Sequence, residues 1–213
     1  MNTTNHEFDE YLINHTTPVD EVLEELTRHT YLTTYNPRMI SGPVQGKFIE
    51  MICRMVTPNR VLEIGTFTSY STICIARALP DGKYIDTIEV NDELQETIEY
   101  FIEKAGVSGK VNLIIGNALE IIPTLPHNYD LIYIDGEKKE YPQYLNLCLK
   151  KLNNGGFLIA DNVLWNGKVI DLSCNDEQTN AIRQFNKMVQ ENSCLENVLL
   201  PIRDGMMMVR KKI

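Results

Sequence analysis

The chain is 213 residues long and 43% of its residues are hydrophobic, which is enough to bury one substantial core. Its 20 basic and 29 acidic residues give a net charge of -9, which disfavours nucleic acid and anionic membrane surfaces as partners. No linker, repeat or low-complexity tract divides the sequence. We therefore expect one domain over residues 1–213, with N-terminal helices in 1–57 and a core in 58–213.

Five cysteines are scattered along the chain without a C-x-x-C pair, which argues against a disulfide framework or a thiolate zinc site. The N-terminus is polar and acidic, unlike a signal peptide, and no apolar stretch reaches the roughly 18 residues that span a bilayer. The sequence therefore predicts a soluble, cytoplasmic protein with no membrane partner.

Two amphipathic helices are expected in the N-terminal part. Thr17 can cap the first helix, which would begin at Pro18 and end near His29, with apolar side chains repeating along one stripe. The second helix would begin near Pro43 and stop before Pro58. Both should pack on the core that follows.

From residue 60 onward, short apolar runs alternate with amphipathic segments. The predicted strands are Val61–Ile64, Tyr84–Val90, Val111–Ile115, Asp130–Ile134 and Phe157–Ala160. The predicted helices are Ser69–Leu79, Asp92–Ala105, Ala118–Ile122, Tyr141–Lys151 and Glu177–Glu191. This alternation predicts an α/β fold, a doubly wound and mostly parallel sheet with helices on both faces.

The C-terminal segment departs from the alternation. Two apolar runs, Val198–Ile202 and Met206–Val209, are separated only by Arg203, Asp204 and Gly205. Such a short link can close a hairpin but cannot hold a crossover helix. We therefore expect a C-terminal antiparallel strand pair, which by fold analogy is typical of methyltransferase domains and not of nicotinamide-binding ones.

The first functional candidate is the turn after strand Val61–Ile64. Ligands of open α/β sheets bind at the carboxyl ends of the strands, and Gly65 at this end permits a tight turn before a helix N-terminus. Phe67 and Tyr70 replace the later glycines of a G-x-G-x-x-G turn, so the segment suits the methionine end of S-adenosylmethionine better than a pyrophosphate. The alternative is an ordinary βα turn, which also needs a glycine.

Glu89, at the end of the next predicted strand, is a candidate for the ribose of the same cofactor. It lies 24 positions after Gly65, close to the spacing of about 20 expected for an acid that binds two vicinal hydroxyls. The alternative is a solvated acid that begins a loop.

Two further strand ends carry oxygen donors. Asp135 follows strand Asp130–Ile134, and Asp161 and Asn162 follow the next strand. Carboxylate and amide oxygens without cysteine or histidine favour a hard cation such as Mg²⁺. The alternative is that each acid caps a helix or a turn.

Lys138 lies three residues after Asp135. Near a cation and a sulfonium its pKa would be lowered, and a neutral lysine could act as general base for a phenol. The alternative is an exposed basic pair with Lys139.

Together these residues resemble the cation-dependent O-methyltransferases, the family of catechol and caffeoyl-CoA O-methyltransferases. The resemblance covers the chain from about Arg38 to Arg210, and it is carried by these segments: Met39-Ile40-Ser41, Gln45-Gly46, Glu63-Ile64-Gly65, Ile134-Asp135-Gly136-Glu137-Lys138, Asp161-Asn162-Val163-Leu164-Trp165-Asn166-Gly167 and Leu200-Pro201-Ile202-Arg203-Asp204-Gly205. It implies a class I methyltransferase fold.

The resemblance also implies a role for each candidate residue. The implied metal ligands are Asp135, Asp161 and Asn162, and the implied base is Lys138. The implied cofactor residues are Ser41, Glu63, Gly65 and Ser71 around the methionine and metal pocket, Glu89 at the ribose, Ala118 at the adenine edge through its backbone, and Asp135. It further implies S-adenosyl-L-methionine, a divalent cation (Mg²⁺ first, Ca²⁺ or Mn²⁺ as alternatives), a catechol-like acceptor and a homodimer.

Some positions depart from the family pattern. Phe67 stands where the animal enzymes have a tyrosine, and Gly136-Glu137 stands where the plant enzymes have Ala-Asp. The segment 168–177 matches no pattern of the family and is expected to help to set the choice of substrate.

The expected mechanism is an in-line methyl transfer to a phenolate that the metal acidifies and Lys138 deprotonates. Three rival functions stay open. A nicotinamide-dependent dehydrogenase is disfavoured by the missing glycines and by the terminal hairpin. A nucleic-acid methyltransferase is disfavoured by the net charge and by the absence of an Asn-Pro-Pro-aromatic motif. A non-catalytic binding protein on the same fold is disfavoured by the complete set of site residues.

Overall fold

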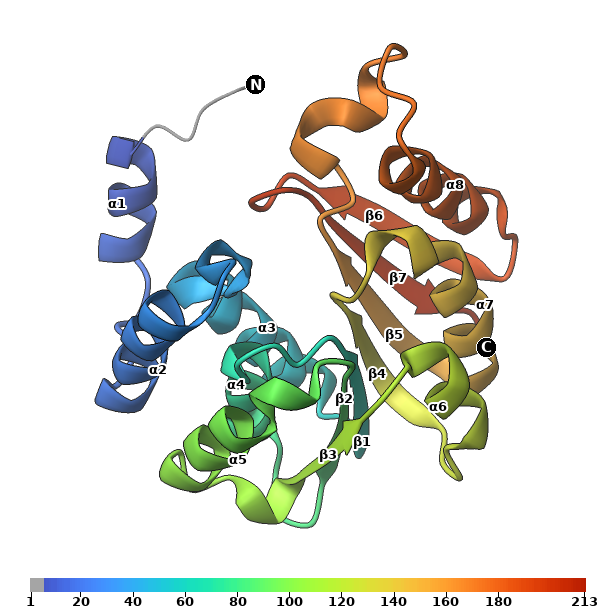
Figure 1. The fold of residues 1–213 in the computed structure, drawn as a ribbon. Helices are drawn as coiled ribbons and strands as arrows, with labels where there is room; N and C mark the ends of the chain where they lie inside the picture. The colour runs from blue at the N-terminus through green and yellow to red at the C-terminus, as the bar shows by residue number, and fades with distance from the viewer. Residues whose placement is uncertain (1–5) are drawn as a thin grey trace.

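Seven strands form one sheet at the centre of the protein, in the order β3-β2-β1-β4-β5-β7-β6 (Figure 1). The computed structural model describes residues 6–213. The strands are β1 (Arg60–Ile64), β2 (Tyr84–Glu89), β3 (Val111–Ile115), β4 (Tyr129–Ile134), β5 (Leu152–Asp161), β6 (Leu195–Leu200) and β7 (Met206–Lys211). β1 to β5 pair in parallel, whereas β7 is antiparallel to both β5 and β6. The predicted mostly parallel sheet with a C-terminal antiparallel pair is therefore confirmed.

The described part of the chain also contains eight α-helices. They are α1 (His6–Asn14), α2 (Glu21–Thr33), α3 (Gly42–Val56), α4 (Tyr70–Ala78), α5 (Gln95–Lys104), α6 (Ala118–Thr124), α7 (Tyr141–Lys151) and α8 (Glu177–Glu191). Short 3-10 turns lie at Pro37–Met39, Asp92–Leu94, Ser108–Lys110, Lys138–Glu140 and Trp165–Ile170. Within residues 6–213, no helix has the length and apolar character needed to cross a membrane.

The sheet buries a separate hydrophobic cluster on each face, because side chains alternate along a strand. Leu62 and Ile64 of β1 join the cluster formed with α6, α7 and α8, while Val61 joins the cluster formed with α2 to α5. Figure 1 shows α4 and α5 on one side of the sheet and α6, α7 and α8 on the other. Helices therefore cover both faces, as the near-continuous apolar strands predict.

The N-terminal segment corrects one expectation and adds a helix. α2 begins at Glu21 and not at Pro18, and its cap is Asp20, whose side chain accepts a hydrogen bond from the Leu23 N–H. Asp20 also pairs with Arg77 of α4 at 2.6 Å, so a tertiary contact favours the later start over capping by Thr17. The helix α1 was not predicted from the sequence.

Strand boundaries also differ from those predicted, most of all at β5 and β6. β5 begins at Leu152 instead of Phe157, because Leu152 pairs with Tyr129 before an irregularity shifts the register. β6 runs over Leu195–Leu200 and therefore ends before Ile202, which accepts a hydrogen bond from the Gly205 N–H inside the turn. The hairpin link is longer than the three residues that the apolar pattern indicated.

Candidate active site at the carboxyl edge of the sheet

The strand register places the predicted site residues in one row. Ile64 of β1 is level with Ile88 of β2 and with Ile134 of β4, and Ile134 is level with Ala160 of β5. The next residue on each of these strands is Gly65, Glu89, Asp135 or Asp161. Residues that are 96 positions apart in the chain therefore meet at one edge of the sheet, around the point where the strand order reverses between β1 and β4.

Gly65 is required by the close approach of two backbones. Its φ is +96°, and a Cβ atom at this position would overlap the carbonyl carbon and oxygen of Asp135. The Gly65 N–H donates to Ile88 O at 2.9 Å, and the Asp135 N–H donates to Ile64 O at 2.8 Å. The turn after β1 and the turn after β4 are thus locked together, and α4 begins a few residues later.

Glu63 and Ser71 lie together beneath this turn. Glu63 has no exposed surface, and its carboxylate accepts hydrogen bonds from the hydroxyls of Ser71 (2.6 Å), Thr72 (2.5 Å) and Thr87 (2.6 Å). Burial raises the pKa of Glu63 to about 7, although the three hydroxyl donors act to lower it. The carboxylate therefore joins the start of α4 to β1 and β2 through hydroxyls and does not face the solvent.

Glu89 and Ala118 lie on the β2 and β3 side of the site. The Glu89 carboxylate accepts from the Phe67 N–H at 2.7 Å and from the Asn91 N–H at 2.9 Å, which fixes its orientation beside the Gly65 turn. Ala118 is the first residue of α6, after the cap Asn117, and its N–H is one of the helix-start groups without an intrahelical acceptor. Both positions are compatible with the roles that the family resemblance implies.

Asp135 and Asp161 form an acidic pair. Asp161 is 3% exposed, and burial together with the neighbouring Asp135 charge raises its pKa to about 6. Asn162 follows in the left-handed conformation, with φ of 58°, and its N–H donates to Asp161 Oδ1 at 2.8 Å. Among the described residues, no cluster of three or more His, Cys, Asp or Glu side chains could hold a metal, so a metal here would need the amide in addition to the two carboxylates.

Lys138 is buried beside this pair. Its Nζ donates to Asp135 Oδ1 at 2.8 Å and to the Tyr141 hydroxyl at 2.8 Å, and that hydroxyl donates to Asp161 O at 2.8 Å. Burial alone would lower the pKa of Lys138, but the Asp135 carboxylate and the Tyr141 hydroxyl reverse the effect and raise it above the ordinary value. The lowering of the Lys138 pKa that the sequence led us to expect requires a bound cation and a sulfonium nearby. In the protein alone, the charge that faces Lys138 is the negative charge of Asp135.

Comparison with known proteins shows the family. The O-methyltransferase family model matches residues 14–212. The chain belongs to the O-methyltransferase family. It is 32% identical to a catechol O-methyltransferase of Niastella koreensis over 168 residues, covering 77% of this chain and 76% of that protein. It is 29% identical to caffeoyl-CoA O-methyltransferase 1 of Eucalyptus globulus, covering 91% of this chain and 81% of the relative.

A solved structure agrees in fold along nearly the whole length of this O-methyltransferase. The enzyme of Bacillus cereus, crystallised in complex with SAH, is 29% identical, covers 97% of each chain and superposes with a TM-score of 0.91. The class I methyltransferase fold expected from the strand pattern is therefore confirmed.

Gln45 and Arg203 were missed as site residues by the sequence reasoning. Gln45 of α3 donates from Nε2 to Asp161 Oδ2 at 2.5 Å and to the Tyr133 hydroxyl at 2.7 Å, and its Oε1 accepts from Arg203 Nη1 at 2.6 Å. Arg203 Nη1 also donates to the backbone carbonyls of Ile40 and Ser41. The motifs that contain Gln45 and Arg203 were identified in the sequence, but their contacts join residues 88 to 163 positions apart, and only the fold shows them.

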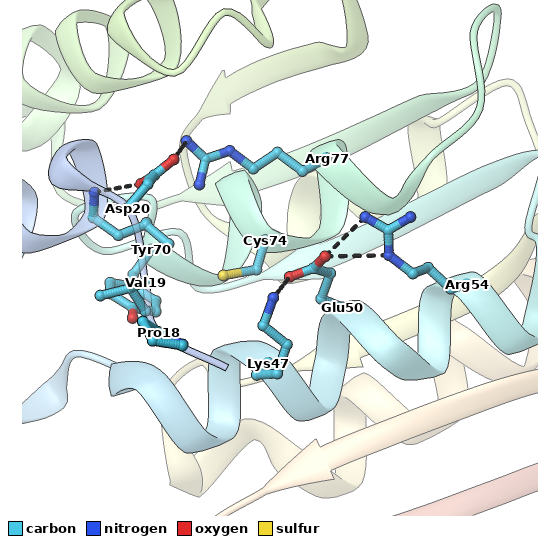
Figure 2. A pocket seen from close by; sticks show the side chains of 10 residues that line it. Pro18, Val19, Asp20, Lys47, Glu50, Arg54, Tyr70, Cys74 and Arg77 are labelled. Carbon is cyan, nitrogen blue, oxygen red and sulfur yellow. Dashed lines mark hydrogen bonds and ion pairs between the residues drawn. The ribbon is translucent and has the colours of Figure 1, made fainter. Parts of the chain in front are cut away.

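Two cavities lie away from these residues. One of about 200 Å³ lies between the start of α2, α3 and α4, and its charged groups pair with each other, Asp20 with Arg77 and Glu50 with Lys47 and Arg54 (Figure 2). The other, of about 640 Å³, is lined by residues near the amino ends of β1 and β4 and by the β5 segment 154–157. Neither cavity is lined by a predicted site residue.

Proposed function

We propose that this O-methyltransferase transfers a methyl group from S-adenosyl-L-methionine to a hydroxyl of a catechol-like or caffeoyl-type small molecule, with a divalent cation bound beside the acceptor. The observation that carries the proposal is the row of Gly65, Glu89, Asp135 and Asp161 at the carboxyl edge of four adjacent strands. The row brings together the turn that we assign to the cofactor at Gly65, the acid that we assign to its ribose at Glu89, and the two oxygen-bearing side chains of Asp135 and Asp161.

The acidic pair is suited to a divalent cation. Asp135 lies close enough to Asp161 to raise its pKa, so the two negative charges repel each other unless positive charge is bound beside them. Lys138 supplies only one positive charge for the two carboxylates. The donors that Asp135, Asp161 and Asn162 offer are all oxygens, which favours Mg²⁺ and also admits Ca²⁺ or Mn²⁺. We assign these three side chains as the metal ligands.

The cofactor would occupy the other half of the row. We assign its methionine moiety to the Gly65 turn and the start of α4, including Ser71, its ribose to Glu89, and its adenine edge to the backbone of Ala118. Ser41 and Asp135 would border the pocket on the metal side. Because the Glu63 carboxylate is fully buried and accepts three hydroxyl hydrogen bonds, we assign it the role of holding Ser71 and the turn in place.

In the reaction, the residues of this chain mainly position groups and move one proton. When bound, the cation supplies positive charge that acidifies the acceptor hydroxyl and offsets the Asp135 carboxylate. Lys138 Nζ would take the proton of that hydroxyl as a neutral amine, a form that the positive charges of the bound cation and the sulfonium would favour, and the Tyr141 hydroxyl would hold the resulting ammonium group in position. The Gly65 turn would hold the methyl donor beside the acceptor, which would lower the entropic cost of the transfer.

The deciding experiment is a methyl-transfer assay with labelled S-adenosylmethionine over a panel of catechols and caffeoyl thioesters, with Mg²⁺ added or with excess chelator. We expect labelled product from at least one acceptor with Mg²⁺ and none with chelator. Product formation that is unaffected by the chelator would overturn the metal role. A binding titration that favours NADH over S-adenosylhomocysteine would overturn the cofactor assignment in favour of a dehydrogenase.

Two further outcomes address the remaining alternatives. Binding of S-adenosylhomocysteine without turnover on any acceptor of the panel would favour a non-catalytic binding protein. The homodimer that the family resemblance implies remains part of this proposal, and light scattering after size-exclusion chromatography should give twice the monomer mass of 24.4 kDa.

A further inference from the structure

We propose that Gln45 and Arg203 are positioning residues that set the metal affinity of the site by holding Asp161 in one orientation. The inference rests on the proposed function, since it concerns the metal-binding role of Asp161. It adds two residues that are neither metal ligands nor cofactor contacts in that proposal. They come from distant parts of the sequence, one from α3 and one from the β6–β7 turn.

The partners of the Gln45 side chain fix the orientation of its amide. Arg203 has only N–H donors, so the amide atom that it contacts at 2.6 Å must be the oxygen. The Asp161 carboxylate is an acceptor, so the atom that contacts it at 2.5 Å must be the amide nitrogen. A flipped amide would place donor against donor and acceptor against acceptor. The network thus admits one orientation only.

Two hydrogen bonds orient the Asp161 carboxylate. Gln45 Nε2 holds Oδ2 of this carboxylate, and the Asn162 N–H holds Oδ1. Both oxygens keep a free lone pair for a metal, but the carboxylate group can no longer rotate. Because Gln45 has no exposed surface and Asp161 is 3% exposed, water cannot readily replace the amide. A preoriented ligand binds a metal more tightly than one that must first be ordered.

The Arg203 side chain is anchored to residues at the start of α3. Its φ is 49°, a left-handed conformation that a residue with a side chain seldom adopts. Although the residue as a whole is exposed, its Nη1 reaches inward to the Ile40 and Ser41 carbonyls and to Gln45 Oε1. The two hydrogens of Nη1 are shared among these three acceptors, and the contacts tie the β6–β7 turn to the start of α3.

The same hairpin turn holds the segment that follows the metal ligands. Asp204 O accepts from the Leu164 N–H at 2.9 Å, and Gly205 O accepts from the Val163 N–H at 3.0 Å. A Cβ atom on Gly205 would overlap Leu164. The β6–β7 turn therefore holds Val163 and Leu164, directly after the proposed metal ligands, through backbone hydrogen bonds. It also holds Asp161 through Arg203 and Gln45.

The test measures Mn²⁺ binding by calorimetry for the full-length protein, its Gln45→Met and Arg203→Lys variants, and the Asp161→Ala reference. Methionine keeps the length of glutamine without its hydrogen bonds, and lysine keeps the charge of arginine without its fork. We expect Gln45→Met to weaken Mn²⁺ binding about 10- to 100-fold and Arg203→Lys to weaken it less, while S-adenosylhomocysteine binding changes less than about twofold in both. The matched control is Arg77→Lys, because Arg77 forms an ion pair with Asp20 and lies outside the hydrogen-bond network of Gln45, Arg203 and Asp161.

The outcomes separate this inference from the proposed function. If the wild type binds Mn²⁺, Asp161→Ala does not, and folded Gln45→Met binds it as tightly as the wild type, the positioning role is wrong and the metal site stands. If the wild type does not bind Mn²⁺, or Asp161→Ala binds it equally well, both the metal site and the inference fail. Should Gln45→Met not fold, unchanged Mn²⁺ affinity in Arg203→Lys alone would overturn the inference. A parallel loss of S-adenosylhomocysteine binding in both variants would indicate a general structural role and would also overturn it.

Discussion

Gly65 and Asp135 are in direct backbone contact, so that a Cβ atom on Gly65 would overlap the Asp135 carbonyl group. This contact joins the turn assigned to the cofactor to the first of the residues assigned to the metal. Any side chain at position 65 must therefore displace one of the two turns.

Gly65→Ala should consequently impair both stability and cofactor binding. The positive φ and the overlap should together lower the free energy of unfolding by about 2–4 kcal/mol, measured by urea denaturation. S-adenosylhomocysteine binding by calorimetry should weaken at the same time. Gly82→Ala is the matched control, since Gly82 also has a positive φ but nothing lies within 4 Å of its added Cβ. Equal losses in the two variants would show that the contact with Asp135 is unimportant.

Asp161→Ala should abolish turnover with a catechol acceptor and leave S-adenosylhomocysteine binding largely intact. The variant removes the buried carboxylate of the pair but does not touch the Gly65 turn. The assay is product formation with Mg²⁺ present, alongside a calorimetric titration of the cofactor product. Turnover equal to that of the wild type would contradict the assigned metal role.

Lys138→Met should reduce kcat by a factor of about 10² to 10⁴, the range typical of losing a general base. The KM for S-adenosylmethionine should change little, because Nζ contacts Asp135 and Tyr141 on the acceptor side. Lys139→Met is the control, because the adjacent lysine is exposed and pairs only with Glu177 among its described ion pairs. A similar loss of kcat in both variants would point to an effect of local charge instead of proton transfer.

Glu63→Gln should change how stability depends on pH. Burial raises the pKa of Glu63 from an ordinary 4.5 to about 7, so the folded protein holds this proton more tightly than the unfolded chain does. The contribution of Glu63 to stability is therefore complete below about pH 4.5 and is lost as the pH rises through about 7. Urea denaturation should show the wild type losing up to about 3 kcal/mol relative to the variant between about pH 5 and about pH 8. A difference that is constant with pH would contradict the raised pKa.

Arg183→Ala should make the backbone of residues 168–176 more mobile. The Arg183 guanidinium donates to the backbone carbonyls of Lys168, Val169, Asp171 and Cys174. Hydrogen exchange followed by mass spectrometry should show faster exchange in this segment and unchanged exchange in α7. If the segment helps to select the acceptor, the acceptor KM should rise severalfold at unchanged S-adenosylhomocysteine affinity. An unchanged KM despite faster exchange would exclude the segment from acceptor binding.

Local patterns were sufficient to predict the sheet and the row of candidate residues. Every parallel strand contains a short apolar run next to a turn signal, and Asp135 and Asp161 stand directly at the ends of neighbouring strands, so their meeting follows from the parallel pairing of those strands. The antiparallel terminal pair followed from a link too short for a helix.

What could not be predicted depends on contacts between distant segments. The start of α2 is set by Asp20, which meets Arg77 only after folding, and the early start of β5 depends on the pairing of Leu152 with Tyr129. The contacts of Gln45 and Arg203 likewise join segments 158 positions apart. The sign of the Lys138 pKa shift also depends on which charges face it, and in the protein alone the nearest is the Asp135 carboxylate.

The placement of β7 between β5 and β6 has a consequence for biosynthesis. β5 ends at Asp161, but its second neighbour in the sheet is made only after α8 and β6 have been translated. Until then, a nascent chain presents the unpaired backbone groups of β5 as a free sheet edge, which can pair with another nascent chain. Stalled or prematurely terminated translation products that lack β7 should therefore be prone to aggregation and should depend on chaperones.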